Sequence, residues 1–240
     1  MAYKTELQSK GYQVIEDFLN PSECQKLLDG IQDFRDNNKL QEIFRAVRGR
    51  NLHYFVIRGD QIEKNLSDIH HLYIGKVKQK VNELVRDELA PLSNLQARLN
   101  VNIMPPGDYE YRWHYDRNYI TAILYLNKVQ GGETEFYPNN RIYLKNKYMA
   151  LQKLIDWVLN LPFIRFFLSR KVAIAPQVGR LIVMQANRSL HSVTPAMGDH
   201  DRINIIMAYD FPSVEFPVEK GLDKYIYTRD KQESTDPNYG

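Results

Sequence analysis

Cysteine and long apolar runs are scarce in this sequence. Cys24 is the single cysteine in 240 residues, so no disulfide can form within the chain, and a disulfide-stapled secreted scaffold is excluded. No segment reaches the run of about 18 apolar residues that a membrane-spanning helix needs, and residues 1–6 lack the apolar core of a signal peptide. We therefore expect a soluble protein without a transmembrane segment, and we predict a cytoplasmic location.

Charge of one sign is scarce as well. Lysine and arginine number 32 against 29 aspartate and glutamate residues, and the basic residues are scattered along the chain. Proteins that bind nucleic acids typically gather basic residues into a patch or stripe, so we expect no nucleic-acid partner. The length suffices for one sizeable core, and no shift in composition marks a second domain.

What stands out is a set of two histidines and one carboxylate. His114 and Asp116 are separated by one residue, and His191 follows far downstream. In an extended strand, residues i and i+2 lie on the same face, so His114 and Asp116 can reach one metal ion while Tyr115 points away. Such a ligand set holds one face of a non-haem Fe(II) ion and leaves the other face open. The sequence therefore predicts a reactive iron site, with His191 supplied by a strand that is adjacent only in space.

A candidate anion-binding residue follows the second histidine. Arg202 comes about eleven residues after His191 and opens an apolar, strand-like run over 203–209. A guanidinium on such a strand offers a fork of hydrogen-bond donors to a carboxylate deep in a barrel.

These residues and their surroundings resemble the Fe(II)/2-oxoglutarate-dependent dioxygenases of the prolyl-4-hydroxylase-like branch. The matching segments are 114–116, 125–127, 131–134, Pro176 with Gly179, and 191–195 through Gly198 to Arg202. The resemblance implies that His114, Asp116 and His191 are the catalytic iron ligands. It also implies that Arg202 and Tyr125 bind the far carboxylate of 2-oxoglutarate, although Tyr125 could instead be a core tyrosine with a satisfied hydroxyl.

Four further residues are candidates for contact with substrate or with the ligands. Tyr111 and Arg117 flank the ligand run, and surface exposure is the alternative for both. Thr134 and Phe136 lie in a predicted hairpin after Gly131-Gly132, which in the family borders the metal site.

The fold class that follows is mainly β with flanking helices (α+β), a double-stranded β-helix or cupin-like jelly roll. We expect one domain, with 1–94 as N-terminal support, 95–212 as the jelly-roll core, an insertion at about 140–173, and 213–240 as a C-terminal tail. The pattern of the support predicts a helix from Pro21 to about Phe34, capped by Asn20 with Glu23. It also predicts an amphipathic helix over 72–89.

Two segments leave alternatives open. Arginines at 45, 48, 50 and 58 lie near aromatic residues and either line a pocket for an anionic substrate or belong to a solvated loop and edge strand, which we favour. The insertion is apolar and helix-like, and it could be a lid over the barrel mouth, a homodimer contact, a membrane-surface anchor, or helices packed on the chain's own core. We prefer the last interpretation.

The resemblance implies an enzyme that hydroxylates an unactivated C–H bond with Fe(II), 2-oxoglutarate and O₂, with ascorbate as an optional stimulant. The expected substrate is a small molecule, an amino acid or an intermediate of natural-product biosynthesis. A peptidyl-prolyl hydroxylase is one alternative, and a non-catalytic cupin-like metal-binding or sensing module is another. Asp116 favours hydroxylation, because halogenating relatives carry a small residue at this ligand position.

Overall fold

The computed structural model describes residues 5–47, 50–111, 113–142, 149–159, 161, 163–164, 167 and 170–213. Within this part of the chain every pair of named strands is antiparallel. No helix in the described ranges is long and apolar enough to cross a membrane. The tail expected at 213–240 lies, after residue 213, outside the described residues.

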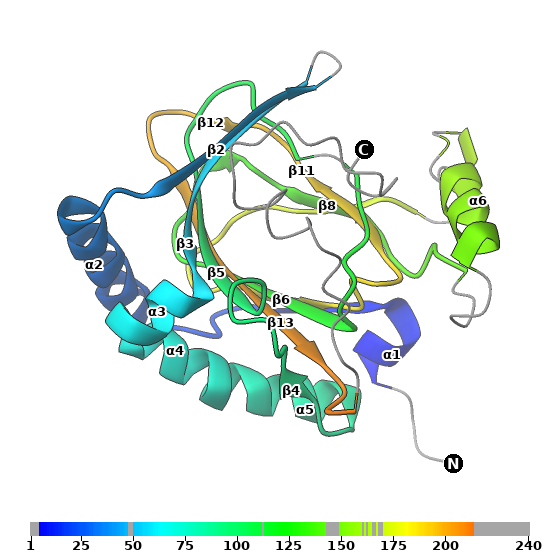
Figure 1. The fold of residues 1–240 in the computed structure, drawn as a ribbon, viewed down its shortest axis with the longest axis horizontal. Helices are drawn as coiled ribbons and strands as arrows, with labels where there is room; N and C mark the ends of the chain where they lie inside the picture. Colours follow the sequence, from blue (N-terminus) through cyan, green and yellow to red (C-terminus); the bar gives the residue numbers. More distant parts are fainter. Residues whose placement is uncertain are drawn as a thin grey trace.

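The architecture consists of a large sheet that faces two smaller ones, with helices on the outer side of the large sheet (Figure 1). The large sheet has the order β1(Tyr12–Ile15), β10(Leu181–Met184), β6(Ile120–Tyr125), β13(Arg202–Asp210), β5(Leu99–Met104), β3(Arg50–Arg58) and β2(Gln41–Val47), and β4(Ala90–Pro91) pairs with β13. The smaller sheets are β11(Leu190–Val193), β8(Thr134–Tyr137), β9(Val172–Ile174), and β12(Ala196–Met197) with β7(Gln130–Gly131). This is the predicted jelly roll, and β2 is the edge strand expected for the segment around residue 45.

Helices cover the outer face of the large sheet. They are α1(Glu6–Lys10), α2(Pro21–Asn37), α3(Gly59–Asn65), α4(Ser67–Leu72), the π-helix η1(Tyr73–Val77) and α5(Lys78–Val85). Alternate residues of β6 and β13, such as Ala122, Leu124, Ile205 and Met207, belong to the core that these helices close. Because side chains alternate across a strand, the intervening residues of the same strands face the barrel interior, where the candidate site lies.

The start of α2 confirms the predicted cap. The Asn20 side chain accepts a hydrogen bond from the Glu23 backbone N–H at 2.9 Å, and the Glu23 carboxylate accepts one from the Asn20 N–H at 2.7 Å. The helix runs to Asn37, three residues beyond the predicted end. Cys24 is buried on its inner face.

The amphipathic helix predicted over 72–89 is divided into α4, η1 and α5, which together span Ser67–Val85. The irregular part has a tertiary cause. The Tyr209 hydroxyl donates to the Tyr73 carbonyl at 2.7 Å, and the Tyr73 hydroxyl donates to the Ala208 carbonyl at 2.9 Å. A carbonyl that accepts a bond from outside the helix is less available to the regular helical ladder, which is a recognised setting for a wider turn.

The prediction of a hairpin around Gly131-Gly132 is wrong, because the strands before and after it do not pair with each other. β6 lies between β10 and β13 in the large sheet, whereas β8 lies between β11 and β9 in a smaller one. Residues 126–133 therefore carry the chain from one sheet to the other rather than folding it back on β6. Gly131 and Gly132 take φ values of +68° and +62°, a region that favours glycine.

The insertion contains the helix α6(Met149–Leu159), which lies at the periphery of the molecule beside the smaller sheets (Figure 1). Its inner side carries Asp156 and Leu159, both buried, and its outer side is apolar. The helical character expected for this segment is confirmed over these residues. Asn160 and Pro162, which follow the helix in the sequence, lie outside the described part of the chain.

Candidate active site

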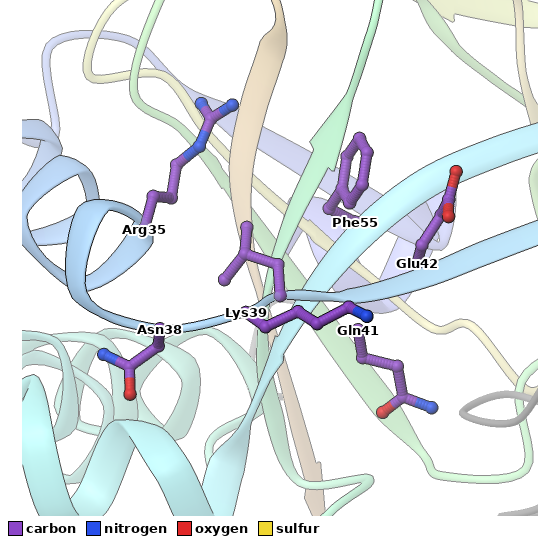
Figure 2. Close-up of a pocket in the computed structure, with 7 residues that line it drawn as sticks. Arg35, Asn38, Lys39, Gln41, Glu42 and Phe55 are labelled. Carbon is purple, nitrogen blue, oxygen red and sulfur yellow. The ribbon is translucent and has the colours of Figure 1, made fainter.

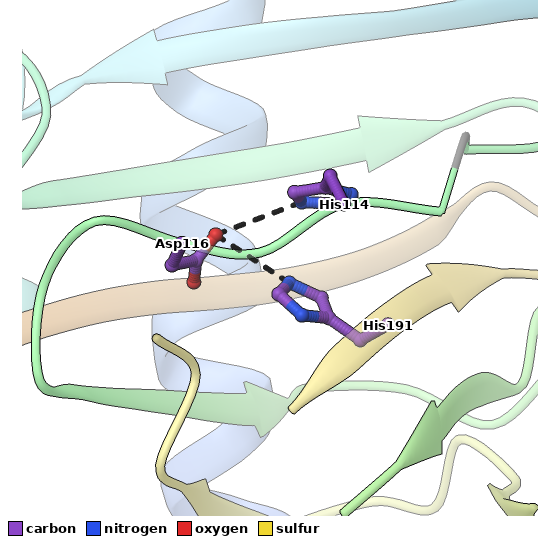
Figure 3. Close-up of side chains that lie close together, drawn as sticks. All are labelled: His114, Asp116 and His191. Atoms are coloured by element: carbon purple, nitrogen blue, oxygen red, sulfur yellow. Dashed lines mark ion pairs between the residues drawn. The ribbon is translucent and has the colours of Figure 1, made fainter. Parts of the chain in front are cut away.

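His114, Asp116 and His191 meet inside the barrel. One ligand atom from each lies within 4.8 Å of the others, and no other such group exists among the described residues. Asp116 Oδ1 is 3.6 Å from His114 Nε2 and 3.4 Å from His191 Nε2, as the dashed lines in Figure 3 show. The predicted ligand set therefore converges on one point.

The backbone that brings the three residues together is a single antiparallel bridge. His114 N–H donates to the His191 carbonyl at 3.0 Å, and His191 N–H donates to the His114 carbonyl at 2.9 Å. Asp116 lies beyond this bridge, with its N–H bonded to the Ala186 carbonyl. His114 and Asp116 thus share a side as predicted, but they lie on an irregular segment rather than on the strand we expected.

Hydrogen bonds on the far sides of His191 and Asp116 orient these two candidate ligands. The Nδ1 atom of His191 lies 2.9 Å from the Ser189 carbonyl, an acceptor, so Nδ1 carries the proton and Nε2 faces Asp116. The Thr121 hydroxyl donates to Asp116 Oδ2 at 2.6 Å and leaves Oδ1 toward the two histidines. Thr121 was not among the predicted site residues, although it shares the inner face of β6 with Tyr125.

Charge inside the site favours an ionised carboxylate. Burial raises the pKa of Asp116, but the charge and hydrogen bond of His191, together with the His114 charge, outweigh it and hold the pKa well below its usual range. Burial lowers the pKa of His191, but the Asp116 carboxylate outweighs that effect and raises it. Asp116 is therefore ionised, as a carboxylate must be to serve as a metal ligand.

A second buried cluster surrounds Arg202, at the start of β13. Its Nη2 is 3.3 Å from Thr134 Oγ1 and 3.5 Å from the Tyr125 hydroxyl, and these two hydroxyls are 2.5 Å apart. Nε–H donates to the Gly132 carbonyl at 2.7 Å, and Nη1 donates to Asn204. Arg202 is only 2% exposed, and Tyr125 and Thr134 are fully buried. A buried guanidinium with adjacent hydroxyls, and with no carboxylate among its partners in the described part of the chain, is suited to binding an anion.

Gly132 allows the arginine to take this position. A Cβ atom at residue 132 would lie 2.7 Å from Arg202 Cδ and 3.3 Å from Nε. The positive φ disfavours any other residue as well. Glycine is therefore required at residue 132 by close approach to the arginine as much as by the change of direction.

Tyr111 and Asn102 connect the two clusters. The Asn102 amide donates to the Tyr111 hydroxyl at 2.7 Å, and Asn102 lies opposite Asn204 in the β5–β13 register. The Tyr111 ring is 6.3 Å from the His114 ring. Burial raises the pKa of Tyr111 well above its usual value, so its hydroxyl stays neutral. Asn102 Oδ1 is buried without a hydrogen-bond partner among the described residues, a sign of a polar interior with capacity for a guest.

The remaining predicted residues fall in different places. Phe136 is fully buried, lies opposite His191 in the β8–β11 register, and packs edge-on against Tyr12 with ring centroids 4.9 Å apart. It contributes an apolar wall. Arg117 is half-buried, and contact with a substrate stays a prediction for it.

Of the four arginines considered for an anion-binding pocket, only the Arg58 side chain is described, and it is paired within its own segment. Arg58 makes two hydrogen bonds to Asp60, at 3.0 and 2.9 Å, and the side chains of residues 45, 48 and 50 lie outside the described part. A pocket of about 520 Å³ does exist nearby (Figure 2). It is lined by Arg35, Asn38, Lys39, Leu40, Gln41, Glu42 and Phe55. Arg35 is paired with Asp201 at 3.0 Å, and no residue of the two buried clusters lines this pocket.

Comparison with known proteins gives matches in structure and none in sequence. No protein-family model matches the chain, and no curated protein matches it. Similar solved structures include the epimerase SnoN of nogalamycin biosynthesis in complex with Fe³⁺, alpha-ketoglutarate (2-oxoglutarate) and nogalamycin RO, with a TM-score of 0.65, 13% identity, and 85% of this chain and 80% of that chain covered.

Two more neighbours perform different reactions. The carbocyclase SnoK, also from nogalamycin biosynthesis and alpha-ketoglutarate dependent, matches with a TM-score of 0.64 and 16% identity, over 85% of this chain and 81% of that chain. A prolyl hydroxylase from Trichoplax adhaerens, in complex with a peptide of hypoxia inducible factor, matches with a TM-score of 0.55 and 19% identity. The match covers 85% of this chain and 86% of that chain. The chain therefore has the double-stranded β-helix fold of the non-haem iron, 2-oxoglutarate-dependent enzymes.

Proposed function

We propose that this protein is a non-haem Fe(II)/2-oxoglutarate-dependent dioxygenase that hydroxylates an unactivated C–H bond of a small molecule. The observation that carries the proposal is the presence, in one barrel, of a cluster of two histidines and one carboxylate and of a buried arginine with two hydroxyls. The first cluster suits Fe(II) with open positions. The second suits the far carboxylate of 2-oxoglutarate.

His114, Asp116 and His191 would hold the iron. The protein prepares them for this role, because Ser189 fixes the proton of His191 on Nδ1 and Thr121 occupies the Asp116 oxygen that faces away from the histidines. Two imidazole nitrogens and one carboxylate oxygen are then presented together. When bound, iron with 2-oxoglutarate and O₂ would supply the oxidising chemistry, and 2-oxoglutarate would leave as succinate and CO₂.

Arg202, Tyr125 and Thr134 would hold the far end of 2-oxoglutarate. The guanidinium carries five N–H groups. Nε–H donates to Gly132, Nη1 donates to Asn204 and Nη2 donates to the Tyr125 and Thr134 hydroxyls, so a second N–H of Nη1 remains for a carboxylate. One of the two hydroxyls donates to the other, which leaves one hydroxyl hydrogen for the same carboxylate. This carboxylate site also argues against a non-catalytic metal-holding module, because a protein that only bound a metal would have no use for it.

A small-molecule substrate is favoured by the comparisons. SnoN and SnoK, both of nogalamycin biosynthesis, match with TM-scores of 0.65 and 0.64, above the 0.55 of the prolyl hydroxylase. The three neighbours catalyse different outcomes, and hydroxylation is the one that we propose for this protein. Asp116 argues against halogenation as a further alternative. Its carboxylate fills the position that a halide takes in halogenating relatives.

The metal and cosubstrate sites can be tested together. Anaerobic protein should bind one equivalent of Fe(II) and develop a weak visible absorption band when 2-oxoglutarate is added. His191→Ala should abolish the band. Arg202→Leu should bind Fe(II) normally but lose affinity for 2-oxoglutarate by roughly 100-fold or more, because a carboxylate left unpaired in a buried site costs about 3–5 kcal/mol.

The reaction itself requires a substrate screen. Succinate formation, measured with ascorbate present, should rise with a small molecule from a panel of amino acids, natural-product intermediates, proline peptides and lipids. The product should contain one oxygen atom from labelled O₂, even at high chloride. Full activity of metal-free protein would overturn the enzyme class. A chlorinated product from the unmodified protein would overturn the role of Asp116, and a proline peptide as preferred substrate would overturn the small-molecule assignment.

A further inference from the structure

The outer face of α6 is apolar and open to solvent. Leu151, Leu154 and Trp157 follow each other at intervals of three residues, so they lie on one side of the helix, and they are 47%, 56% and 59% exposed. Phe163 and Phe167, which follow the helix, are 62% and 81% exposed. A helix on the surface of a soluble protein normally turns its polar residues outward. In α6 the apolar residues face outward and the acidic residue Asp156 faces inward.

The inner face of α6 shows that this orientation is built into the fold. Asp156 is buried and makes two hydrogen bonds with Arg141, one of them at 2.8 Å, and accepts another from Gln152 at 2.8 Å. Arg141 also donates to the Asn187 carbonyl at 3.1 Å. A rotation of the helix that buried the leucines would expose this ion pair and break these bonds. The apolar residues are therefore held outward by the polar ones.

The insertion also has an unusual charge. Residues 141–171 contain seven basic residues and one acidic residue, a net charge of +6, whereas the chain as a whole carries +3. The basic residues are Arg141, Lys145, Lys147, Lys153, Arg165, Arg170 and Lys171. The acidic residue is Asp156, which is buried against Arg141, so the segment offers no exposed carboxylate of its own.

We propose that α6 and the residues after it dock this protein on the surface of an anionic lipid bilayer. Exposed leucine, tryptophan and phenylalanine side chains can enter the boundary between headgroups and acyl chains, while lysine and arginine side chains bind anionic headgroups. A helix that lies flat on a membrane needs this combination of an apolar face and basic residues. The inference goes beyond the proposed function and does not depend on it.

A second copy of the chain is a poorer occupant of this face. In a two-fold dimer the same surface lies on both sides of the interface. Two segments rich in basic residues would then meet, and although Lys171 is paired with Glu135, the repulsion between the remaining positive charges would oppose the gain from apolar burial. An anionic lipid bilayer can bury the apolar side chains and pair with the basic ones at the same time.

Flotation of the full-length protein with vesicles tests the proposal. The protein should bind vesicles of phosphatidylcholine mixed with phosphatidylserine and should bind phosphatidylcholine vesicles much more weakly. Trp157→Glu and Leu154→Glu should each reduce the partition coefficient roughly tenfold or more, since each removes an exposed apolar side chain that the bilayer would bury. Arg170→Glu, at an exposed position, should reduce binding to the anionic vesicles by roughly tenfold.

Matched controls lie on other surfaces. Ile74→Glu changes an exposed isoleucine of η1, and Lys64→Glu changes an exposed lysine of α3, and both should bind like the wild type. The chain has two tryptophans, Trp113 and Trp157. Vesicles should shift the tryptophan emission of the wild type to shorter wavelength, and Trp157→Phe should lose most of that shift while still floating with the vesicles.

Several results would overturn the proposal. Absence of binding to anionic vesicles, equal binding to both compositions, or equal loss of binding in Ile74→Glu and Trp157→Glu would each do so. Analytical ultracentrifugation tests whether a second copy of the chain binds to this face instead. A wild-type dimer that Trp157→Glu converts to a monomer, together with no vesicle binding, would assign the face to a second copy. All variants change exposed side chains, so circular dichroism should show that they remain folded.

Discussion

At the scale of single residues, the orientation of Asp116 depends on Thr121. The hydroxyl donates to Oδ2 at 2.6 Å, and the Asn118 amide in turn donates to the Thr121 oxygen at 2.9 Å. This chain of donors fixes which carboxylate oxygen faces the histidines. Partners of this kind typically change metal affinity by roughly 10–100-fold when removed.

Replacement of Thr121 by valine tests this dependence. Valine keeps the shape of threonine but cannot donate to Asp116, so we expect Fe(II) affinity to fall by roughly 10–100-fold. Thr121→Ser keeps the hydroxyl and should stay close to the wild type. Anaerobic competition with a chelating dye measures both affinities. A valine variant that binds Fe(II) as tightly as the serine variant would show that the hydrogen bond does not position the carboxylate.

The charged residues of the candidate site were proposed from the sequence, and the structure brings them into two clusters, but their neutral partners were not predicted. His114, Asp116, His191 and Arg202 are recognisable because their chemistry and spacing are unusual in any chain. Thr121, Asn102 and Asn204 are ordinary strand residues, and their role depends on the register that brings them beside a ligand. For Thr121 a signal did exist, since it lies four residues before Tyr125 on the same face of β6.

At the scale of elements, the start of β13 is held by the side chain of Asn127, which lies in the crossover between β6 and β8. The Asn127 amide donates to the Asp201 carbonyl at 2.7 Å, and its oxygen accepts from the Ile203 N–H at 2.9 Å. These two backbone groups flank Arg202. Asn127 therefore holds the backbone on both sides of the arginine without touching the proposed cosubstrate.

Loss of the Asn127 side chain should therefore affect stability and one ligand only. Asn127→Ala should lower the free energy of unfolding by about 1–3 kcal/mol, because two backbone groups lose their partner. Affinity for 2-oxoglutarate should fall as well, while Fe(II) affinity stays unchanged because the proposed iron ligands lie on other segments. Denaturant unfolding and calorimetric titration measure these quantities, with Lys128→Ala as the neighbouring control. Reduced stability with unaltered 2-oxoglutarate affinity would confine Asn127 to a structural role.

Elements with local signals were predictable, and elements defined by distant partners were not. The capping residues of α2 lie within four positions of each other, so the sequence carries the whole signal. The pairing of β8 with β11 joins residues more than fifty positions apart, and nothing in the Gly131-Gly132 pattern distinguishes that pairing from a hairpin. The π-helix at Tyr73 likewise depends on Tyr209, at the far end of the chain.

At the scale of the whole molecule, α6 is joined to the barrel through Arg141, which pairs with Asp156 of α6 and donates to the Asn187 carbonyl. Asp156→Ala would leave the Arg141 charge in a largely buried position, 10% exposed, without its carboxylate. We expect the free energy of unfolding to fall by about 3–5 kcal/mol. Lys171→Ala is the control, because it removes a more exposed ion pair with Glu135 and should change stability by about 0–1 kcal/mol. Chemical denaturation that gave the same small change for both would show that the insertion is not anchored by this pair.

The attachment of the insertion also reaches the candidate iron ligands. Tyr115 lies between His114 and Asp116 in the sequence. The Cζ atom of Arg141 lies over the Tyr115 ring, 4.6 Å from the ring centroid. The neighbouring Asn140 donates to the Tyr115 hydroxyl at 3.1 Å and accepts from the N–H of Leu190, the residue before His191. Thermodynamic linkage then imposes a reciprocal relation: any factor by which a bilayer tightens Fe(II) binding is the factor by which Fe(II) tightens binding to the bilayer.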